Sequence, residues 1–215
     1  MKRPVSFRSP NELFHADSCE PLKQAALAGS VRLAALGRGS YPGARLPKND
    51  LREVCLTGYW DAAKDQSWGL GWHRNEGLEL SFVEAGQVPF ALEDGRNYLL
   101  EPGTLTITRP WQRHRVGNPH VLASRFHWLI IDVGVRRPNQ PWLWPSWLLY
   151  PRRGLQRLTT MLRQNEQPVW RADEEIARWL REGDAPVVLM ANKAEGRAGD
   201  DGVMEAFSLG LGDPV

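Results

Sequence analysis

The sequence is poor in cysteine and contains no long hydrophobic run. Its two cysteines, Cys19 and Cys55, lie in unlike surroundings and lack the paired spacing of a disulfide framework. We therefore expect free thiols in a reducing compartment. No apolar stretch approaches the roughly 18 residues that a membrane-spanning helix needs. The basic residues at the start are not followed by the apolar core of a secretory signal, so the sequence predicts a cytoplasmic protein without a membrane anchor.

The sequence also lacks a strong charge of either sign. A formal net charge of +2 argues against a chain devoted as a whole to binding nucleic acid. Arginines cluster locally near positions 109–115 and 152–157, and we expect them to lie on solvated basic faces. Hydrophobic residues make up 42% of the chain and charged residues 24%, which is typical of a globular protein with a packed core.

Tryptophan is abundant instead. The chain contains 10 tryptophans, and most of them fall between positions 60 and 170. Large aromatic side chains concentrated in this way build a core or line a ligand cleft. For any single tryptophan, core packing is the favoured interpretation.

Residues 53–132 have the pattern of successive β-strands. Short apolar segments at 79–84, 88–92, 97–100 and 104–108 are separated by turn formers, among them Asp94-Gly95 and Pro102-Gly103. The segment 125–133 is the longest apolar strand of the series. Many short strands with regular turns predict a β-sandwich or barrel.

The regions on either side of these strands differ in character. Residues 1–50 are expected to form an N-terminal arm with one helical stretch at 21–28, and residues 51–135 a barrel. In residues 136–170, a linker rich in proline and tryptophan precedes an amphipathic helix whose apolar positions are Leu155, Leu158 and Leu162. Residues 171–215 switch to a helix at 173–181 and a buried strand at 186–190, which indicates a separate α/β fragment.

The residues best suited to chemistry lie between positions 73 and 118. His73, Asn75 and Glu79 are spaced H-x-N-x3-E, and His114 follows after two glycine-containing turns. This pattern resembles the two-part cupin signature, in which His-x-His-x3-Glu and a later histidine converge. The resemblance implies a mainly β fold, a cupin-type double-stranded β-helix (jelly-roll barrel).

The same residues suggest a metal site, with a structural alternative. His73, Glu79 and His114 form a two-histidine, one-carboxylate set of the kind used by non-haem iron. Asn75, in the place of the second histidine, is a weaker neutral ligand. Each histidine could equally be a hydrogen-bonded structural residue, and no metal or other cofactor is part of the favoured interpretation.

The segments 78–119 and 163–170 resemble the N-terminal sensing domain of AraC-type regulators. The resemblance runs from about residue 7 to residue 170 and implies a small-molecule effector, such as a sugar or an organic acid. It also implies a homodimer formed through the helix that carries Leu155, Leu158 and Leu162. By position, the residues lining the effector pocket are His73, Glu79, Arg109, Trp111 and His114.

The family implies a further region that residues 171–215 do not match. AraC-type regulators continue with two helix-turn-helix motifs, and residues 171–215 show neither. We therefore expect no specific DNA binding by this chain alone.

Residues 173–215 resemble part of the GTPase Der instead. The segment Asn192-Lys193-Ala194-Glu195 stands where such GTPases carry Asn-Lys-x-Asp, and Glu195 replaces the aspartate that recognises guanine. No G-x-x-x-x-G-K-[ST] loop occurs in the sequence to hold the phosphates. Asn192, Lys193 and Glu195 are therefore interpreted as the remnant of a nucleotide site without activity.

Four functional hypotheses follow from the sequence. The favoured one is a non-catalytic, effector-sensing, dimerising domain. The second is a metal-dependent cupin enzyme that uses His73, Glu79 and His114. The third is a GTPase or ribosome-associated protein related to Der, and the fourth is the product of a frameshift or gene rearrangement with a tail that never packs.

Overall fold

The computed structural model describes residues 6–8, 13–137, 140–164, 168–172, 174, 177–178, 206 and 208–210. The chain divides into two compact units, residues 1–169 and 170–215. The helix expected at 173–181 lies mostly outside the described residues. The strand expected at 186–190 and the segment Asn192–Glu195 lie wholly outside them. The fold and the site below belong to the first unit.

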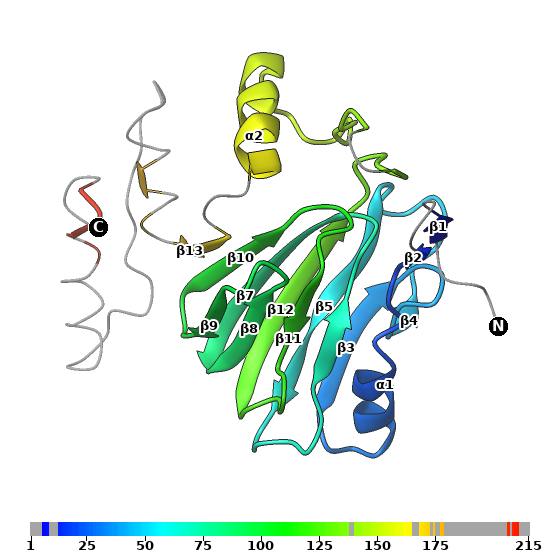
Figure 1. The fold of residues 1–215 in the computed structure, drawn as a ribbon, viewed down its shortest axis with the longest axis vertical. Helices are drawn as coiled ribbons and strands as arrows, with labels where there is room; N and C mark the ends of the chain where they lie inside the picture. Colours follow the sequence, from blue (N-terminus) through cyan, green and yellow to red (C-terminus); the bar gives the residue numbers. More distant parts are fainter. Residues whose placement is uncertain are drawn as a thin grey trace. The chain divides into compact units, whose positions relative to one another are not determined.

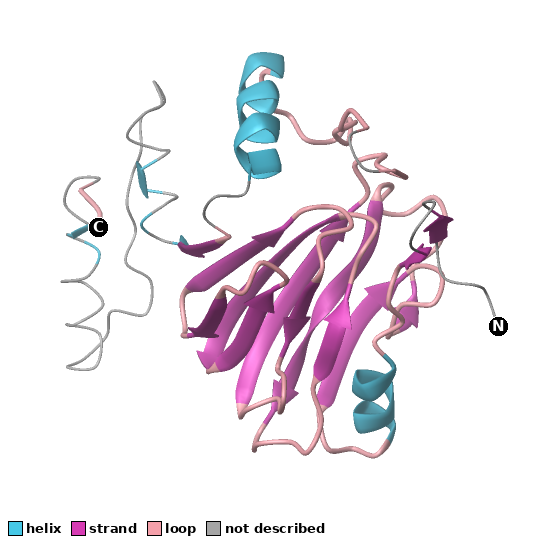
Figure 2. Cartoon of the chain, viewed as in Figure 1, coloured by secondary structure: helices cyan, strands magenta, loops and turns pink. Residues whose placement is uncertain are grey.

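The first unit is built mainly from two β-sheets (Figures 1 and 2). Within this unit the larger sheet has the strand order β10-β7-β12-β5-β3-β4. Its strands are β3 (Arg32–Gly37), β4 (Ala44–Arg45), β5 (Val54–Ala62), β7 (Leu78–Gly86), β10 (Thr104–Thr108) and β12 (Ser124–Ile131).

The smaller sheet has the order β6-β11-β8-β9. Its strands are β6 (Leu70–His73), β8 (Val88–Leu92), β9 (Asn97–Leu100) and β11 (His114–Val116). Buried side chains from both sheets form one hydrophobic cluster, with Trp60 and Phe126 from the larger sheet and Phe90 and Val116 from the smaller one. The mainly β, double-stranded barrel predicted from the sequence is confirmed.

Alternation along each strand separates the inner from the outer face. In β12, Phe126, Trp128 and Ile130 are buried, whereas His127 and Leu129 between them are half-buried. Side chains of a strand point alternately to opposite faces, so one face of β12 packs into the barrel and the other is directed outward. The same alternation decides which polar side chains can enter the barrel interior.

The segment 1–50, which the sequence predicts to be an irregular arm, contributes two strands to the larger sheet. The expected helix is present as α1 (Glu20–Leu27), but β3 pairs antiparallel with β5, and β4 pairs with β3. The pairing depends on Gly58, because a Cβ there would lie 2.4 Å from the Ala34 carbonyl oxygen. Because β3 consists largely of small side chains, the sequence carries no clear strand pattern there. A separate hairpin, β1 (Ser6–Arg8) with β2 (Leu13–His15), precedes α1.

Helix α2 (Arg152–Gln164) follows the barrel, and the three-residue strand β13 (Val169–Arg171) comes after it. Leu162 is buried, and Leu155 and Leu158 are half-buried, within the single chain. The indole Nε1 of Trp144 donates to Thr159 Oγ1 at 2.7 Å, which ties the helix to the preceding segment. The leucine stripe is therefore partly covered without a second copy of the chain.

Among the described residues, no helix combines the length and the apolar character needed to cross a membrane.

Candidate functional site

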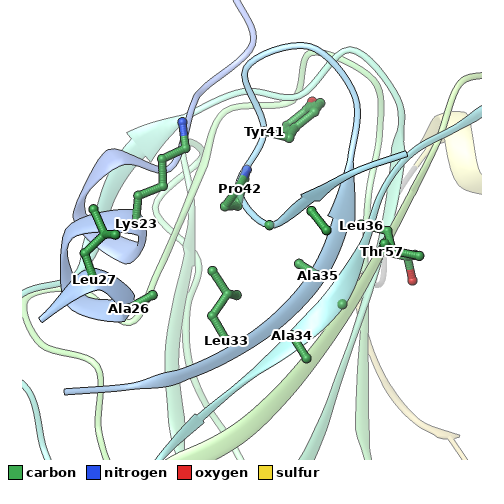
Figure 3. Close-up of a pocket in the computed structure, with 13 residues that line it drawn as sticks. Lys23, Ala26, Leu27, Leu33, Ala34, Ala35, Leu36, Tyr41, Pro42 and Thr57 are labelled. Atoms are coloured by element: carbon green, nitrogen blue, oxygen red, sulfur yellow. The ribbon is translucent and has the colours of Figure 1, made fainter. Parts of the chain in front are cut away.

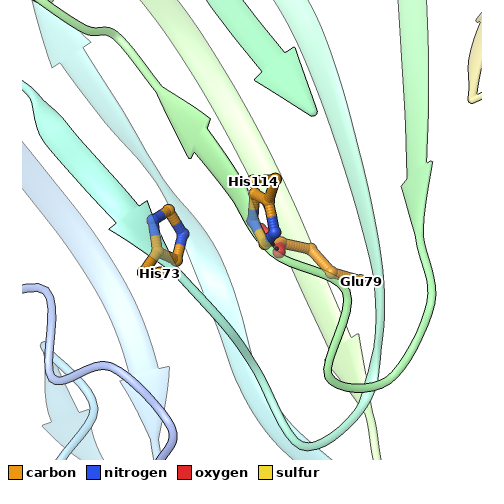
Figure 4. A group of neighbouring side chains, drawn as sticks. All are labelled: His73, Glu79 and His114. Carbon is orange, nitrogen blue, oxygen red and sulfur yellow. Dashed lines mark ion pairs between the residues drawn. The ribbon is translucent and has the colours of Figure 1, made fainter. Parts of the chain in front are cut away.

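Three strands bring His73, Glu79 and His114 together. His73 ends β6, Glu79 is the second residue of β7, and His114 begins β11. His114 is the cross-strand partner of His73, which places the two imidazoles side by side with ring centroids 4.2 Å apart. One potential ligand atom from each of the three residues lies within 4.8 Å of the others, and the side chains point toward one another (Figure 4).

The backbone fixes the orientation of both imidazoles. His73 Nδ1 lies 2.7 Å from the carbonyl oxygen of Gly71, and His114 Nδ1 lies 2.9 Å from that of Gln112. Because a carbonyl oxygen only accepts hydrogen bonds, each Nδ1 carries the proton and donates it. In a neutral ring Nε2 then keeps its lone pair, which is the arrangement found in metal-ligating histidines.

The Glu79 carboxylate is held by several donors. Asn75 Nδ2 donates to its Oε2 at 2.7 Å, and the Ser81 and Thr108 hydroxyls donate to Oε1 and Oε2 at 3.3 Å. Oε2 also lies 3.0 Å from His114 Nε2. Nε2 is buried and makes no hydrogen bond of normal geometry among the described residues, so its contact with Oε2 is an ion pair when His114 is protonated.

Burial and mutual charge shift the pKa values of the cluster. Burial and, to a smaller extent, the neighbouring His114 lower the pKa of His73 to about 4. For Glu79, burial raises the pKa, but His114, His73 and the Asn75 amide outweigh it and bring the value to about 2. Burial lowers the pKa of His114, and the Glu79 carboxylate more than offsets this and raises it. At neutral pH the cluster thus contains a carboxylate and a neutral His73.

The donor set fits a divalent transition-metal ion. Two imidazole nitrogens and one carboxylate oxygen are borderline ligands suited to iron, manganese, cobalt, nickel or zinc. Two ligands about 2.1 Å from one ion and at right angles are about 3.0 Å apart, which matches the distance between His114 Nε2 and Glu79 Oε2. The buried Nε2 without a hydrogen bond is the atom that such an ion would satisfy.

The space next to the cluster is small. The cavity has a volume of about 20 Å³ and includes His73, Asn75 and Glu79 in its polar lining. A cavity needs about 10–15 Å³ to accept one water molecule. At this volume the cavity has room for an ion or a water but not for a sugar-sized molecule.

Two of the five residues predicted for an effector pocket point elsewhere. Arg109 Nη1 donates to the carbonyl oxygen of Arg163, and Trp111 Nε1 donates to that of Val135. The Trp111 ring also packs edge-on against Phe14. Neither residue is among the described residues that line the cavity. Both residues lie in the turn of residues 109–112 that directly follows β10.

Sequence patterns missed three contributors to the site. Cys19 and Leu22, at the start of α1, line the cavity opposite the barrel strands. Tyr41, from the loop between β3 and β4, reaches Asn75 and Glu76 with its hydroxyl group. All three lie in the segment interpreted as an arm, and no motif relates them to the H-x-N-x3-E pattern.

Both cysteines are buried free thiols. Burial, reinforced by Asp17, raises the pKa of Cys19, and burial, reinforced by Glu76, raises that of Cys55. Because the thiolate is the nucleophile, a raised pKa slows alkylation. We expect iodoacetamide at pH 7.5 to leave both thiols of the folded protein unmodified, and to modify both in denaturant, as read by intact mass. Rapid labelling of the folded chain would contradict this burial.

Residues 63–130 match the family model described as "Cupin domain". The match includes β7 to β11 and all three residues of the cluster, so the chain contains a cupin domain with a mainly β, double-stranded β-helix fold.

The chain is also similar, over a short segment, to the GTPase Der. The chain is 74% identical to the protein of Novosphingobium aromaticivorans over 43 residues, which are 20% of this chain and 9% of the relative. It is 63% identical to the protein of Hyphomonas neptunium over 43 residues, 20% of this chain and 8% of the relative. The chain thus spans about a tenth of these curated relatives.

Solved structures with a similar arrangement include two cupin-like proteins. One is described as a predicted oxalate decarboxylase from Thermotoga maritima, 21% identical over 40% of this chain and 74% of that one, with a TM-score of 0.33. Another is a DMSP lyase from Ruegeria pomeroyi, 15% identical over 56% of this chain and 54% of that one, with a TM-score of 0.31. At these values the similarity carries no argument about activity.

Proposed function

We propose that the cupin domain binds one divalent transition-metal ion through His73, Glu79 and His114. The observation that carries the proposal is the convergence of one potential ligand atom from each of His73, Glu79 and His114, all within 4.8 Å of one another in a buried cluster. The small cavity beside the cluster supports an occupant the size of an ion. The backbone bonds to both Nδ1 atoms support the tautomer that a ligand needs.

A bound ion would supply Lewis acidity at this place. The chain's own residues would orient it and keep water out. Gly71 and Gln112 hold the imidazoles through their carbonyl groups, and the Asn75 amide restrains the Glu79 carboxylate. The aromatic and aliphatic side chains around the cavity exclude bulk solvent. A cupin enzyme and a metal-containing sensor would both use this arrangement.

The proposal is tested by measuring metal content and affinity. We expect protein purified without chelators to contain about one transition-metal ion per chain by elemental analysis. After removal of the metal, we expect Co²⁺ to bind at one site and to raise the melting temperature. At a free Co²⁺ concentration 100 times the Kd, binding should raise the free energy of unfolding by about 2.7 kcal/mol. Absence of metal after purification together with no Co²⁺ binding would overturn the proposal.

A second candidate is the effector-sensing role of an AraC-type regulatory domain. What favours it is an open, mainly apolar groove of about 880 Å³ beside α1, lined by side chains of α1, β3 and the following loop (Figure 3). Small-molecule sites have volumes of about 300–1,000 Å³. In this proposal an organic effector binds the groove rather than the small cavity beside the His73–Glu79–His114 cluster, and the domain acts without catalysis.

This second candidate also includes a homodimer through α2. Leu155 and Leu158 are the half-buried positions of the leucine stripe that a second copy could cover. We expect Leu158→Asp to convert a dimer into a monomer in light scattering, with Leu149→Asp, at an exposed site before the helix, as the control.

Sugars and organic acids that raise the melting temperature of the metal-free protein would support effector sensing. An unchanged melting temperature with every compound would count against it.

For residues 173–215, we propose descent from a Der-type GTPase without GTP turnover. A 43-residue match to Der, equal in length to this segment, supports common ancestry. Asn192, Lys193 and Glu195 remain a predicted remnant. GTP binding at micromolar concentration by the full chain would contradict the loss of activity.

A further inference from the structure

Asn75 contacts the cluster but takes no part in it as a ligand. Its side chain is buried, and its Nδ2 donates to Glu79 Oε2 at 2.7 Å. The orientation of the amide is fixed by its two neighbours. A rotated amide would place Oδ1 against the carboxylate, where two acceptors would face each other without a proton. Asn75 therefore presents its amide protons to Glu79 and its oxygen to the opposite side.

On that opposite side lies Tyr41. Its hydroxyl oxygen is 3.3 Å from Asn75 Oδ1 and 2.5 Å from Glu76 Oε2. The hydroxyl group donates to both oxygens through its single proton, with the shorter contact to the Glu76 carboxylate and the longer one to Asn75 Oδ1. Asn75 and Glu76 are both buried, so neither contact competes with bulk water. A continuous series of polar contacts thus runs from Tyr41 through Asn75 to Glu79.

The backbone of the same segment is anchored as well. The amide of Trp111 donates to the Asn75 carbonyl oxygen at 2.8 Å, and that of Asp17 donates to the Arg74 carbonyl oxygen at 3.0 Å. The position of the Asn75 side chain is therefore set by its surroundings. The remaining freedom is the side-chain torsion of Asn75, which only Tyr41 and Glu79 restrain through its polar atoms among the described hydrogen bonds.

We propose that Tyr41 is a positioning residue for the metal site and acts through Asn75, which restrains the Glu79 carboxylate. Tyr41 comes from the loop between β3 and β4, and its ring also lines the groove beside α1. The inference rests on the proposed metal function and deepens it, because it assigns the orientation of one ligand to a residue from outside the cupin motif. Partners around a metal ligand typically change metal affinity about 10–100-fold when they are removed.

The test is a double-mutant cycle on Co²⁺ binding by the full chain. We expect Asn75→Ala to weaken Co²⁺ binding about 10–100-fold and Tyr41→Phe to weaken it about 3–10-fold. In the Asn75→Ala background, we expect Tyr41→Phe to change the affinity by less than about twofold, because coupled residues are not additive. The visible absorption spectrum of bound Co²⁺, which reports its ligand geometry, should shift in both single variants.

Controls separate this inference from the metal proposal and from general loss of stability. Tyr59→Phe is the matched variant, because Tyr59 packs against His127 on the outer face of the sheet. It should leave the affinity and the spectrum unchanged. If Asn75→Ala does not fold, Asn75→Leu replaces it, since leucine keeps a similar volume and has no amide donor.

The outcomes are distinct. Wild-type protein that does not bind Co²⁺ contradicts the proposed function, and the inference with it. If the wild-type protein binds Co²⁺ and Tyr41→Phe leaves the Co²⁺ affinity unchanged, the inference about Tyr41 is wrong but the metal proposal stands. The same holds if Tyr41→Phe weakens Co²⁺ binding equally in the wild-type and the Asn75→Ala backgrounds.

Discussion

Glu79→Gln is expected to reduce the affinity for Co²⁺ by at least about 100-fold. The binding free energy of a structural zinc ion with four ligands is about 10–16 kcal/mol. One charged ligand therefore contributes roughly 3 kcal/mol, and each 1.4 kcal/mol changes the Kd tenfold. Glutamine keeps the volume. Its single oxygen can still accept from Asn75 and Thr108, and its amide group can donate to the Ser81 hydroxyl oxygen, so the fold should survive. The measurement is isothermal titration of metal-free protein with Co²⁺.

The chain offers a matched control on the outer face of the larger sheet. There His127 Nε2 lies 2.6 Å from Glu84 Oε2, a histidine–glutamate pair exposed to solvent. Glu84→Gln should leave Co²⁺ affinity within about twofold of the wild-type value, because a single exposed pair lacks the third ligand and the burial of the inner cluster. An equal loss in both variants would contradict the assignment of the site to the barrel interior.

Trp60→Ala is expected to lower the free energy of unfolding by about 3–5 kcal/mol, the range for removing a large aromatic from a core. Trp60 is only 1% exposed, its ring packs 4.7 Å from that of Phe126 and 5.6 Å from that of Trp128, and its Nε1 donates to Ser124 Oγ at 3.2 Å. Alanine would remove these contacts and leave a cavity between the sheets. Urea denaturation followed by circular dichroism measures the change.

Trp147→Ala is the control for this prediction. Trp147 is 45% exposed, and its Nε1 donates to the Arg52 carbonyl oxygen at 2.9 Å. Since little of the ring is removed from water, we expect a change of about 1 kcal/mol or less. Equal destabilisation by the two variants would show that Trp60 does not hold the core as its packing indicates.

Short-range patterns predicted the strands that carry their own signals. The strands β8, β9 and β10 begin and end at the predicted residues, because apolar segments alternate there with Asp-Gly and Pro-Gly turns. The fold class follows from the number and spacing of such strands. β3 was not predicted, since its small side chains become a strand only by pairing with β5 at Gly58.

The site was predictable only in part, for a similar reason. The resemblance to the cupin signature grouped His73, Glu79 and His114, and the strands β6, β7 and β11 bring them together. The resemblance to AraC-type sensing domains implied Arg109 and Trp111 as pocket residues, but their side chains bond to the backbone of Arg163 and Val135. The direction of a side chain in a loop depends on which acceptors the folded chain brings within reach.

The strand and turn patterns of the sequence by themselves determined a β-sandwich or barrel, because strand alternation and turn chemistry are local properties. The resemblance to the cupin signature added the jelly-roll class and the grouping of the three polar residues. Only the tertiary structure decided that the cavity beside the cluster is small and that residues of α1 and Tyr41 complete the surroundings of the cluster. Those contacts join segments more than thirty residues apart, and no local pattern records them. They depend on which strands pair and on how tightly the two sheets pack against each other.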